Sequence, residues 1–436
     1  MTIRLWTCAA ACVLALLLSY PSAVAETSDA APKFTGPGSC SAPSCHGSVR
    51  PRGENSVLQN EYSTWAVLDK HSHAAGALTN EVGKRIGRIL GIKPESSAKC
   101  LDCHALNAAE TQKTRSFDAN DGVSCESCHG PASNWLGPHT TRGWTHEKSL
   151  LEGMHDLRDP IKRSETCLSC HLGSTFKWVD HEMIAAGHPD LYFELDSFSA
   201  AMPKHWKERS KDPWNELRYI SVGEAVQLRE NLRRIARESS RFWPEYSELD
   251  CFACHHNLSG AKNSWRQERG YAGRRAGNPA WNASRWTVLK VILEEVSADD
   301  ARRLDRELMR VNAIVSDITA ERRQIGAVAL AAAEEVDQIS HRIADHRFDS
   351  QAALQLMRRI SLASDWISGH GERSAEQAVM VLNSLVVAYG ANTKSGPELA
   401  QMKSAVTGLF QLVENPAAYN PSSFASQMRV FSALVP

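Results

Sequence analysis

The stretch Cys125-Glu-Ser-Cys128-His129 holds two cysteines separated by two residues, with a histidine directly after the second cysteine. The same spacing occurs three more times along the chain. The four copies lie at residues 100–104, 125–129, 167–171 and 251–255. Residue identities between the cysteines change from copy to copy, so what repeats is the position of two thiols and one imidazole.

A fifth segment ends in the same way but has a longer spacer. Four residues, including Pro43, separate Cys40 from Cys45, and His46 follows. Ten of the twelve cysteines of the chain therefore form five pairs, each followed by histidine. We number the motifs one to five in chain order.

The spacing C-x-x-C-H is the attachment signature of c-type haem. Two thiols bind the porphyrin covalently, and the histidine that follows binds the iron from one side. The sequence thus predicts five covalent haem c groups. The predicted attachment residues are Cys40, Cys45, Cys100, Cys103, Cys125, Cys128, Cys167, Cys170, Cys251 and Cys254, and the predicted proximal ligands are His46, His104, His129, His171 and His255.

Other cysteine chemistries explain this pattern less well. A thioredoxin-like C-x-x-C occurs once beside a βαβ pattern, which the chain lacks. Zinc ribbons need paired cysteine knuckles without an invariant histidine after each. For the stretched first motif a structural disulfide remains an alternative, although Cys45-His46-Gly47 matches the ends of other motifs.

Composition is that of an ordinary globular protein. The chain has 436 residues, 42% of them hydrophobic, with 49 Lys and Arg against 50 Asp and Glu. A formal net charge of −1 gives no basic footprint, so no nucleic-acid partner is expected.

The first 25 residues have the features of a secretory signal. Arg4 is followed by an apolar run over residues 5–18 and by the small-residue site Ala23-Val-Ala25. The run is shorter than the ~20 residues that a membrane-spanning helix needs. We expect a cleaved signal, a periplasmic protein that begins at Glu26, and no membrane span after cleavage.

The second axial ligand of each iron has to come from elsewhere in the chain. Nine further histidines lie near the motifs: His71, His73, His139, His146, His155, His181, His188, His205 and His256. The segment 60–75 reads as a helix that turns either His71 or His73 toward a haem. His139 lies in a loop rich in Gly and Pro, and His181 and His188 are spaced to share one helical face. We take His71, His139, His181 and His188 as candidate ligands, with Met154 and Met183 as thioether alternatives and the other histidines as surface or hydrogen-bonded residues.

These segments resemble the multihaem cytochromes c of the cytochrome c-554 type, which belong to a wider group related to hydroxylamine oxidoreductase and pentahaem nitrite reductase. The resemblance rests on Trp65 and His71 after the first motif, on the third motif with His139 downstream, and on residues 167–189. It covers residues 40–256. It implies electron transfer through closely packed haems, with His71 and His139 as distal ligands.

Three departures from the family stand out. Cytochrome c-554 has four haems rather than five, its motifs lack the stretched spacer, and it has no counterpart of the long tail. The nitrite reductases use C-x-x-C-K at their catalytic haem, whereas every motif here ends in histidine. Since one haem of the c-554 family lacks a distal ligand, an open iron site remains an alternative.

The remaining sequence predicts helices. A helix is expected over residues 223–241, with apolar residues on one face and arginines opposite. After residue 260 the cysteines stop, and apolar residues recur at helical spacing, which predicts five to seven helices from Ser284 onward. His341, His346 and His370 are isolated there and expected to face solvent. The fold class is therefore mainly α: a signal peptide (1–25), a multihaem cytochrome c domain with little regular secondary structure (26–260) and a C-terminal helical bundle (261–436).

The leading functional hypothesis is a pentahaem cytochrome that relays electrons between redox partner proteins. A first alternative is a multihaem oxidoreductase that acts on a small nitrogen or sulfur compound at an iron with an open sixth site. A second is a haem subunit that docks on a larger membrane electron-transfer complex. The sequence favours a carrier over an enzyme without deciding between them, and it identifies no catalytic residue.

Overall fold

The computed structural model describes residues 31–52, 57–207, 210–255, 278–393 and 396–436. The predicted signal, His256 and the predicted domain boundary at residue 260 lie outside these ranges. By contacts the chain divides into residues 1–32 and residues 33–436, and the description below concerns the second unit. The described residues form helices and loops, with isolated β-bridges at Phe34–Lys113 and Leu249–Trp281 and no strand.

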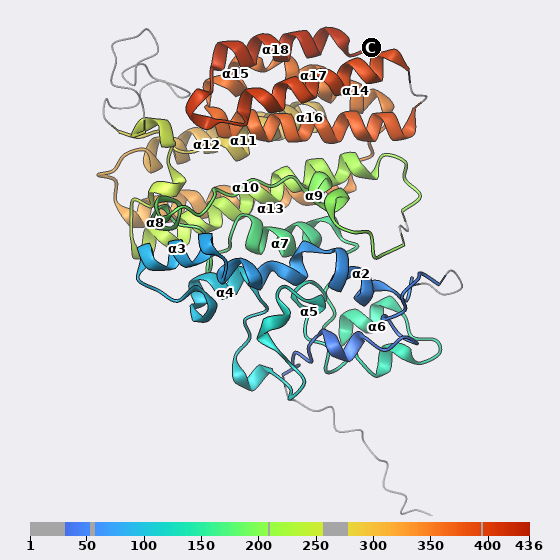
Figure 1. Cartoon of the computed structure of the whole chain (residues 1–436). Coiled ribbons are helices and arrows are strands. Elements are labelled where there is room, and N and C mark those ends of the chain that lie inside the picture. The colour runs from blue at the N-terminus through green and yellow to red at the C-terminus, as the bar shows by residue number, and fades with distance from the viewer. Residues whose placement is uncertain (1–30, 53–56, 208–209, 256–277, 394–395) are drawn as a thin grey trace, which may run out of the picture. The chain divides into compact units, whose positions relative to one another are not determined.

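The motif region consists of short helices and 3-10 turns (Figure 1). Its α-helices are α2 (Glu61–Leu68), α3 (Glu81–Leu90), α4 (Ala98–His104), α5 (Cys125–His129), α6 (His146–Leu151), α7 (Pro160–His171), α8 (His181–Ala186) and α9 (Leu195–Ala201). Its 3-10 helices are η1 (Pro37–Cys40), η2 (Lys70–Leu78), η3 (Pro94–Ser96), η4 (Glu110–Gln112), η5 (Ala119–Asp121), η6 (Pro138–Thr140), η7 (Tyr246–Glu248) and η8 (Cys251–Ala253).

Longer helices make up the rest of the chain. They are α10 (Asn215–Arg241), α11 (Ser284–Val296), α12 (Ala298–Val315), α13 (Arg322–Asp345), α14 (Ser350–Leu362), α15 (Ser364–Gly369), α16 (Glu372–Asn392), α17 (Pro397–Val413) and α18 (Pro421–Leu434), with η9 (Pro416–Ala418) before the last. The mainly α fold is confirmed, as is a helical bundle at the C-terminus. The described region after Ser284 has eight α-helices rather than five to seven. Part of the difference arises because the chain leaves helical geometry at Ala363, which separates α14 from the short α15.

The predicted helix at residues 223–241 begins earlier and is more deeply buried than expected. In Figure 1, α10 lies alongside α13, and it also contacts α7, α9, α11 and α16. Because neighbours surround it, the predicted solvent-facing arginines include two buried residues, Arg229 and Arg234, which are 1% and 6% exposed. Arg229 pairs with Glu165 of α7 at 2.6 Å and Asp337 of α13 at 2.5 Å.

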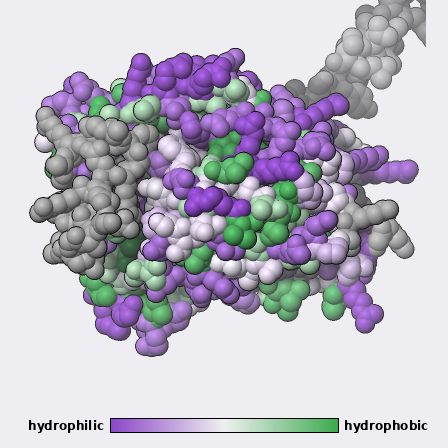
Figure 2. All heavy atoms as spheres, turned by 90° about the horizontal axis from the view of Figure 1, so that it is seen from above, coloured by the Kyte–Doolittle hydropathy of each residue, from purple (hydrophilic) through white to green (hydrophobic). Residues whose placement is uncertain are grey.

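One hydrophobic core runs through this helical region. It extends from Ile161 of α7 to Val435 after α18 and includes the fully buried Trp286 of α11. The core therefore continues across the predicted boundary at residue 260, and the division into two domains stays a prediction. Figure 2, which looks onto the C-terminal helices, shows a mainly hydrophilic face with smaller apolar areas.

No described helix is long and apolar enough to cross a membrane. The expected solvent exposure of the isolated histidines holds for His341. It is wrong for His370, whose ring centre lies 4.1 Å from that of Trp366 and whose Nδ1 donates to the Trp366 carbonyl. Burial lowers the pKa of His370.

Candidate haem-binding site

Helix starts hold several of the motifs in place. Ser124 caps α5, so Cys125 and Cys128 lie on one short helix that ends in His129. Asp159 caps α7 through its side chain, and this helix ends in His171. In motif five, the Asp250 carboxylate accepts a hydrogen bond from the Phe252 amide at the start of η8. Among the described residues no disulfide joins the motif cysteines, Cys40 and Cys45 of the stretched motif included.

A carboxylate that the sequence analysis did not single out joins the first and third motifs. Glu126 is 1% exposed and accepts hydrogen bonds from the backbone amides of Thr35, Gly36 and Ala132 at 2.7–2.9 Å. Gly36 has φ +81°, and a Cβ there would lie 2.9 Å from the Ser116 carbonyl oxygen. The segment leading into Cys40 is thereby held against the motif that carries Glu126. A glutamate inside a motif gives no sequence signal for this role.

Thiols of different motifs approach one another. The Cys125 thiol of motif three lies close enough to Cys40 of motif one to lower the pKa of the Cys40 thiol. The Cys103 thiol of motif two likewise lowers the pKa of the Cys170 thiol of motif four. Lys177 Nζ lies near both of these motifs, 2.5 Å from the Asp102 carbonyl oxygen and 3.2 Å from Cys170 Sγ.

The third and fourth motifs are also neighbours. Burial and the nearby thiols of Cys167 and Cys170 together raise the pKa of the Cys128 thiol to about 12. Together with the two thiol pairs, this contact connects the motifs in the order one, three, four, two.

Histidines pair across the motif region with a recurring separation. The ring centres are 6.2 Å apart in His46–His139, 6.0 Å in His71–His171, 6.3 Å in His104–His188 and 6.3 Å in His181–His255. Each pair joins one motif histidine to one of the four candidate distal histidines. A metal–imidazole bond of about 2 Å on each side, plus about 1 Å from each nitrogen to its ring centre, puts two such rings about 6 Å apart. The four pairs thus have the spacing that two axial ligands of one metal require.

Hydrogen bonds at Nδ1 leave Nε2 available in most of these rings. His139 Nδ1 donates to the Trp135 carbonyl at 2.9 Å, His104 Nδ1 to the Ala74 carbonyl at 3.1 Å and His188 Nδ1 to the Pro189 carbonyl at 2.8 Å. A carbonyl cannot donate, so Nδ1 carries the proton and Nε2 presents its lone pair. Metal-binding histidines characteristically donate their second ring nitrogen in this way.

In two of the rings, Nδ1 is hydrogen-bonded to a carboxylate instead of a carbonyl. His46 Nδ1 lies 2.9 Å from Glu61, and His71 Nδ1 lies 2.9 Å from Asp69. These hydrogen bonds raise the pKa of both imidazoles. Asp69 also accepts a hydrogen bond from the His71 amide at 3.0 Å, and helix α2 ends at this residue. The continuous helix predicted over residues 60–75 is therefore wrong, and His71 lies in η2.

Helix α8 connects the second and fifth motifs. His181 is its first residue and pairs with His255, whereas His188 follows its last turn and pairs with His104. The helix ends because Gly187 adopts φ +108°, so His181 and His188 do not share one helical face as their spacing predicted. Asp180, before α8, forms an ion pair with Lys99 of α4. The order of neighbouring motifs therefore extends to one, three, four, two, five.

The third motif differs from the others. Among the described residues, no ring contact joins His129 to a second imidazole. Burial and the nearby imidazoles of His205, His46 and His155 together lower the pKa of His129 to about 4. His155 and His205 both donate Nδ1 to carbonyls, those of Cys128 and Pro203. His205, expected to be a surface or hydrogen-bonded residue, is therefore a further candidate near this motif.

His146 is arranged differently from the candidate ligands. Its Nε2, and not its Nδ1, lies 3.0 Å from Asp156, so this nitrogen is already engaged.

Met183, a thioether alternative in the sequence analysis, is 4% exposed and lies in α8.

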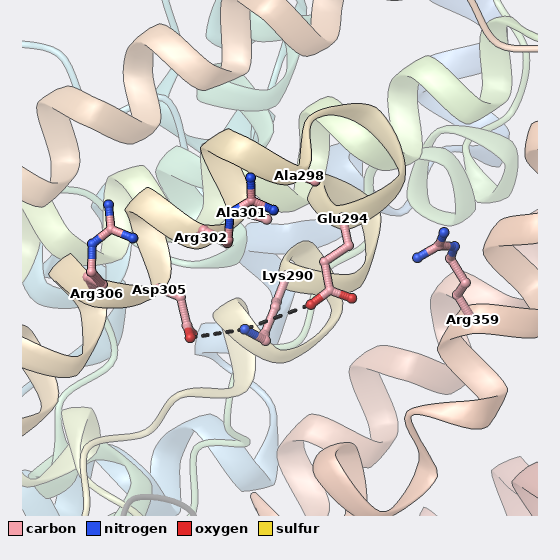
Figure 3. A pocket seen from close by; sticks show the side chains of 8 residues that line it. All are labelled: Lys290, Glu294, Ala298, Ala301, Arg302, Asp305, Arg306 and Arg359. Carbon is pink, nitrogen blue, oxygen red and sulfur yellow. Dashed lines mark ion pairs between the residues drawn. The ribbon is translucent and has the colours of Figure 1, made fainter.

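A pocket in the helical region contains none of the predicted haem residues. Figure 3 shows Lys290 between Glu294 and Asp305, with Arg359 facing them from α14. Lys290 Nζ lies 3.0 Å from Asp305 and 3.8 Å from Glu294. Charged side chains of α11, α12 and α14 thus pair with one another around this pocket.

Comparison with known proteins supports the resemblance seen in the sequence. The model of the family described as cytochrome c554 and c-prime matches residues 40–130. This segment is of the cytochrome c-554 type. It contains motifs one to three and His71, and the match supports a haem-based electron-transfer cytochrome. No curated protein and no solved structure matched the chain.

Proposed function

We propose that the chain is an exported pentahaem cytochrome c that relays electrons between redox partner proteins. The four histidine pairs at 6.0–6.3 Å support this proposal most directly, because their spacing suits an iron between two imidazoles. The five thiol pairs would hold the porphyrins through thioether bonds. When bound, haem c supplies an iron centre that exchanges one electron at a time.

The residues around each pair would keep the ligands in place during such exchange. Carbonyl groups of Trp135, Ala74 and Pro189 fix the orientation of His139, His104 and His188, and the carboxylates of Glu61 and Asp69 make His46 and His71 stronger electron donors to a metal. The order of neighbouring motifs gives a path with the fifth motif at one end and the first at the other. Partner proteins would dock near these ends, and their binding should weaken with added salt.

Replacing a distal candidate tests the ligand assignment. In the holoprotein, His139→Ala should convert one low-spin haem into a high-spin haem that binds carbon monoxide when reduced, as measured by optical and electron paramagnetic resonance spectroscopy. His146→Ala is the matched control, because its Nε2 is engaged by Asp156. An unchanged spectrum for His139→Ala would overturn the assignment of His139.

The third motif favours a second candidate function. His129 has no paired imidazole among the described residues, so an iron there could have an open sixth site, as in the oxidoreductase alternative. The relay hypothesis assigns His205 to this site. Binding of carbon monoxide at one haem of the reduced wild-type protein would favour the enzyme hypothesis. Binding in His205→Ala but not in the wild type would favour the relay hypothesis.

A further inference from the structure

Backbone hydrogen bonds join the segment just before the fifth motif to the segment that leads into the C-terminal helices. The Asp250 amide donates to the Ala280 carbonyl at 2.8 Å, and the Asn282 amide donates to the Glu248 carbonyl at 2.9 Å. Arg373, in the first turn of α16, donates to the Ser247 carbonyl at 3.4 Å. Residues just before α11 and at the start of α16 are therefore hydrogen-bonded to the segment that leads into Cys251.

Three arginines from three helices lie near this segment. They are Arg234 of α10, Arg285 of α11 and Arg373 of α16. Arg234 is satisfied, because it donates to Glu248 and to the Leu172 carbonyl, both at 2.5 Å. Arg373 forms an ion pair with Asp190.

Arg285 is left without a comparable partner. Its two terminal nitrogens make long hydrogen bonds, at 3.3 Å to Ser284 Oγ and 3.4 Å to the Leu191 carbonyl. Its Nε is buried and has no hydrogen-bond partner among the described residues. Burial and the positive charge of Arg234 together lower the pKa of Arg285 to about 10.

Arg285 forms no ion pair among the described residues. The nearby carboxylates Glu248 and Asp190 pair instead with Arg234 and Arg373. A buried charge without a counter-ion is strongly unfavourable. A guanidinium group binds a carboxylate through two parallel hydrogen bonds. One further carboxylate would therefore complete the hydrogen bonding of Arg285.

We infer that Arg285, with Arg373 beside it, binds a propionate carboxylate of the haem held by the fifth motif. Arg373 donates to the carbonyl of Ser247, which lies four residues before Cys251, so the cluster lies close to this attachment site. Tyr246, next to the Ser247 carbonyl that Arg373 contacts, packs on His181 with ring centres 5.6 Å apart. This inference rests on the proposed function and extends it, because it gives the C-terminal helices a role: they supply positive charge to the last haem of the row.

The test is a redox titration of the holoprotein, with five attached haems first verified by mass for every variant. A positive charge near a haem favours its reduced form. Arg285→Gln should therefore lower the midpoint potential of one haem, and Arg285→Lys, which keeps the charge, should restore most of the shift. Arg302→Gln, on the surface of α12, is the matched control and should leave all potentials unchanged. His181→Ala marks the fifth-motif haem by its change of spin state.

Three results would overturn the inference. The first is an unchanged set of potentials in both Arg285→Gln and Arg373→Gln. The second is a shift in a haem other than the one that His181→Ala marks. The third is a wild-type potential that moves with phosphate at constant ionic strength and stops doing so in Arg285→Gln, since this would show a site for a soluble anion. If the measured mass shows fewer than five attached haems in these proteins, the result would instead count against the proposed function.

Discussion

The motif region and the helical region from α10 onward differ in what fills their interiors. In the helical region, apolar side chains from α10 to α18 form one continuous core. Between residues 33 and 160, the buried apolar residues that the structure describes are few and scattered: Leu78, Ile86, Cys100, Ala105, Ala132 and Trp135. The same segment carries the cysteines of motifs one to three and the His46–His139 pair. The comparison indicates that the helical region is stabilised by its own side chains, whereas the motif region needs its cofactors.

Withholding haem should therefore produce the largest effect. In a chain made without haem attachment, we expect residues 57–159 to lose nearly all protection against hydrogen exchange, because their apolar core is too small to offset the loss of conformational entropy. Helices α10–α18 should keep theirs. Hydrogen-exchange mass spectrometry of the two forms measures this difference. Equal protection of the two regions without haem would contradict the comparison.

Arg229 connects the two regions and should give the next largest effect. Its guanidinium joins α7, which carries motif four, to α13 through Glu165 and Asp337. Arg229→Ala should lower the free energy of unfolding by about 3–5 kcal/mol, because it breaks a buried ion-pair network. Denaturation by guanidinium chloride, followed by circular dichroism, measures the loss. The exposed Arg302, paired only with its neighbour Asp299, is the control and should change stability by less than about 0.5 kcal/mol.

Glu224 should give a smaller effect that depends on pH. This carboxyl is 1% exposed, accepts from Gln377 Nε2 at 2.6 Å, and has its pKa raised well above 4.5 by burial and by Glu194. The folded chain therefore keeps a proton that the unfolded chain releases above pH 4.5. Stability should fall by about 1.4 kcal/mol for each pH unit above that value until the folded-state pKa is reached.

Glu224→Gln should remove this decline while keeping the hydrogen bond to the Gln377 side chain through the amide oxygen. Unfolding curves of the wild type and the variant between pH 5 and pH 8 make the comparison, with the exposed Glu398→Gln as control. Parallel pH dependence of wild type and Glu224→Gln would show that Glu224 is not protonated in the folded chain.

Features that depend on the local spacing of residues were predicted well from the sequence. The helical tail follows from apolar periodicity, and the four candidate distal histidines are those that the structure brings within 6.3 Å of motif histidines, although their role as ligands stays a prediction. Which histidine meets which motif could not be predicted, because partners such as His71 and His171 lie far apart in the chain.

Buried polar residues were the main failure of prediction. Glu126, Arg229 and Arg234 have the residue types of exposed positions, and only tertiary contacts decide that they are buried. The break at Asp69 was missed for a related reason. Its side chain bonds to the backbone and ring of His71, a local competition with the helix that helical periodicity does not reveal.

The mass of the denatured holoprotein tests the central claim most directly. Covalent attachment survives denaturation, so intact-protein mass spectrometry counts the haems without assuming their ligands. We predict the mass of the polypeptide after signal cleavage plus five haem groups, with the stretched first motif loaded like the other four. A mass equal to the polypeptide alone, or to the polypeptide with fewer than five haems, would contradict the account.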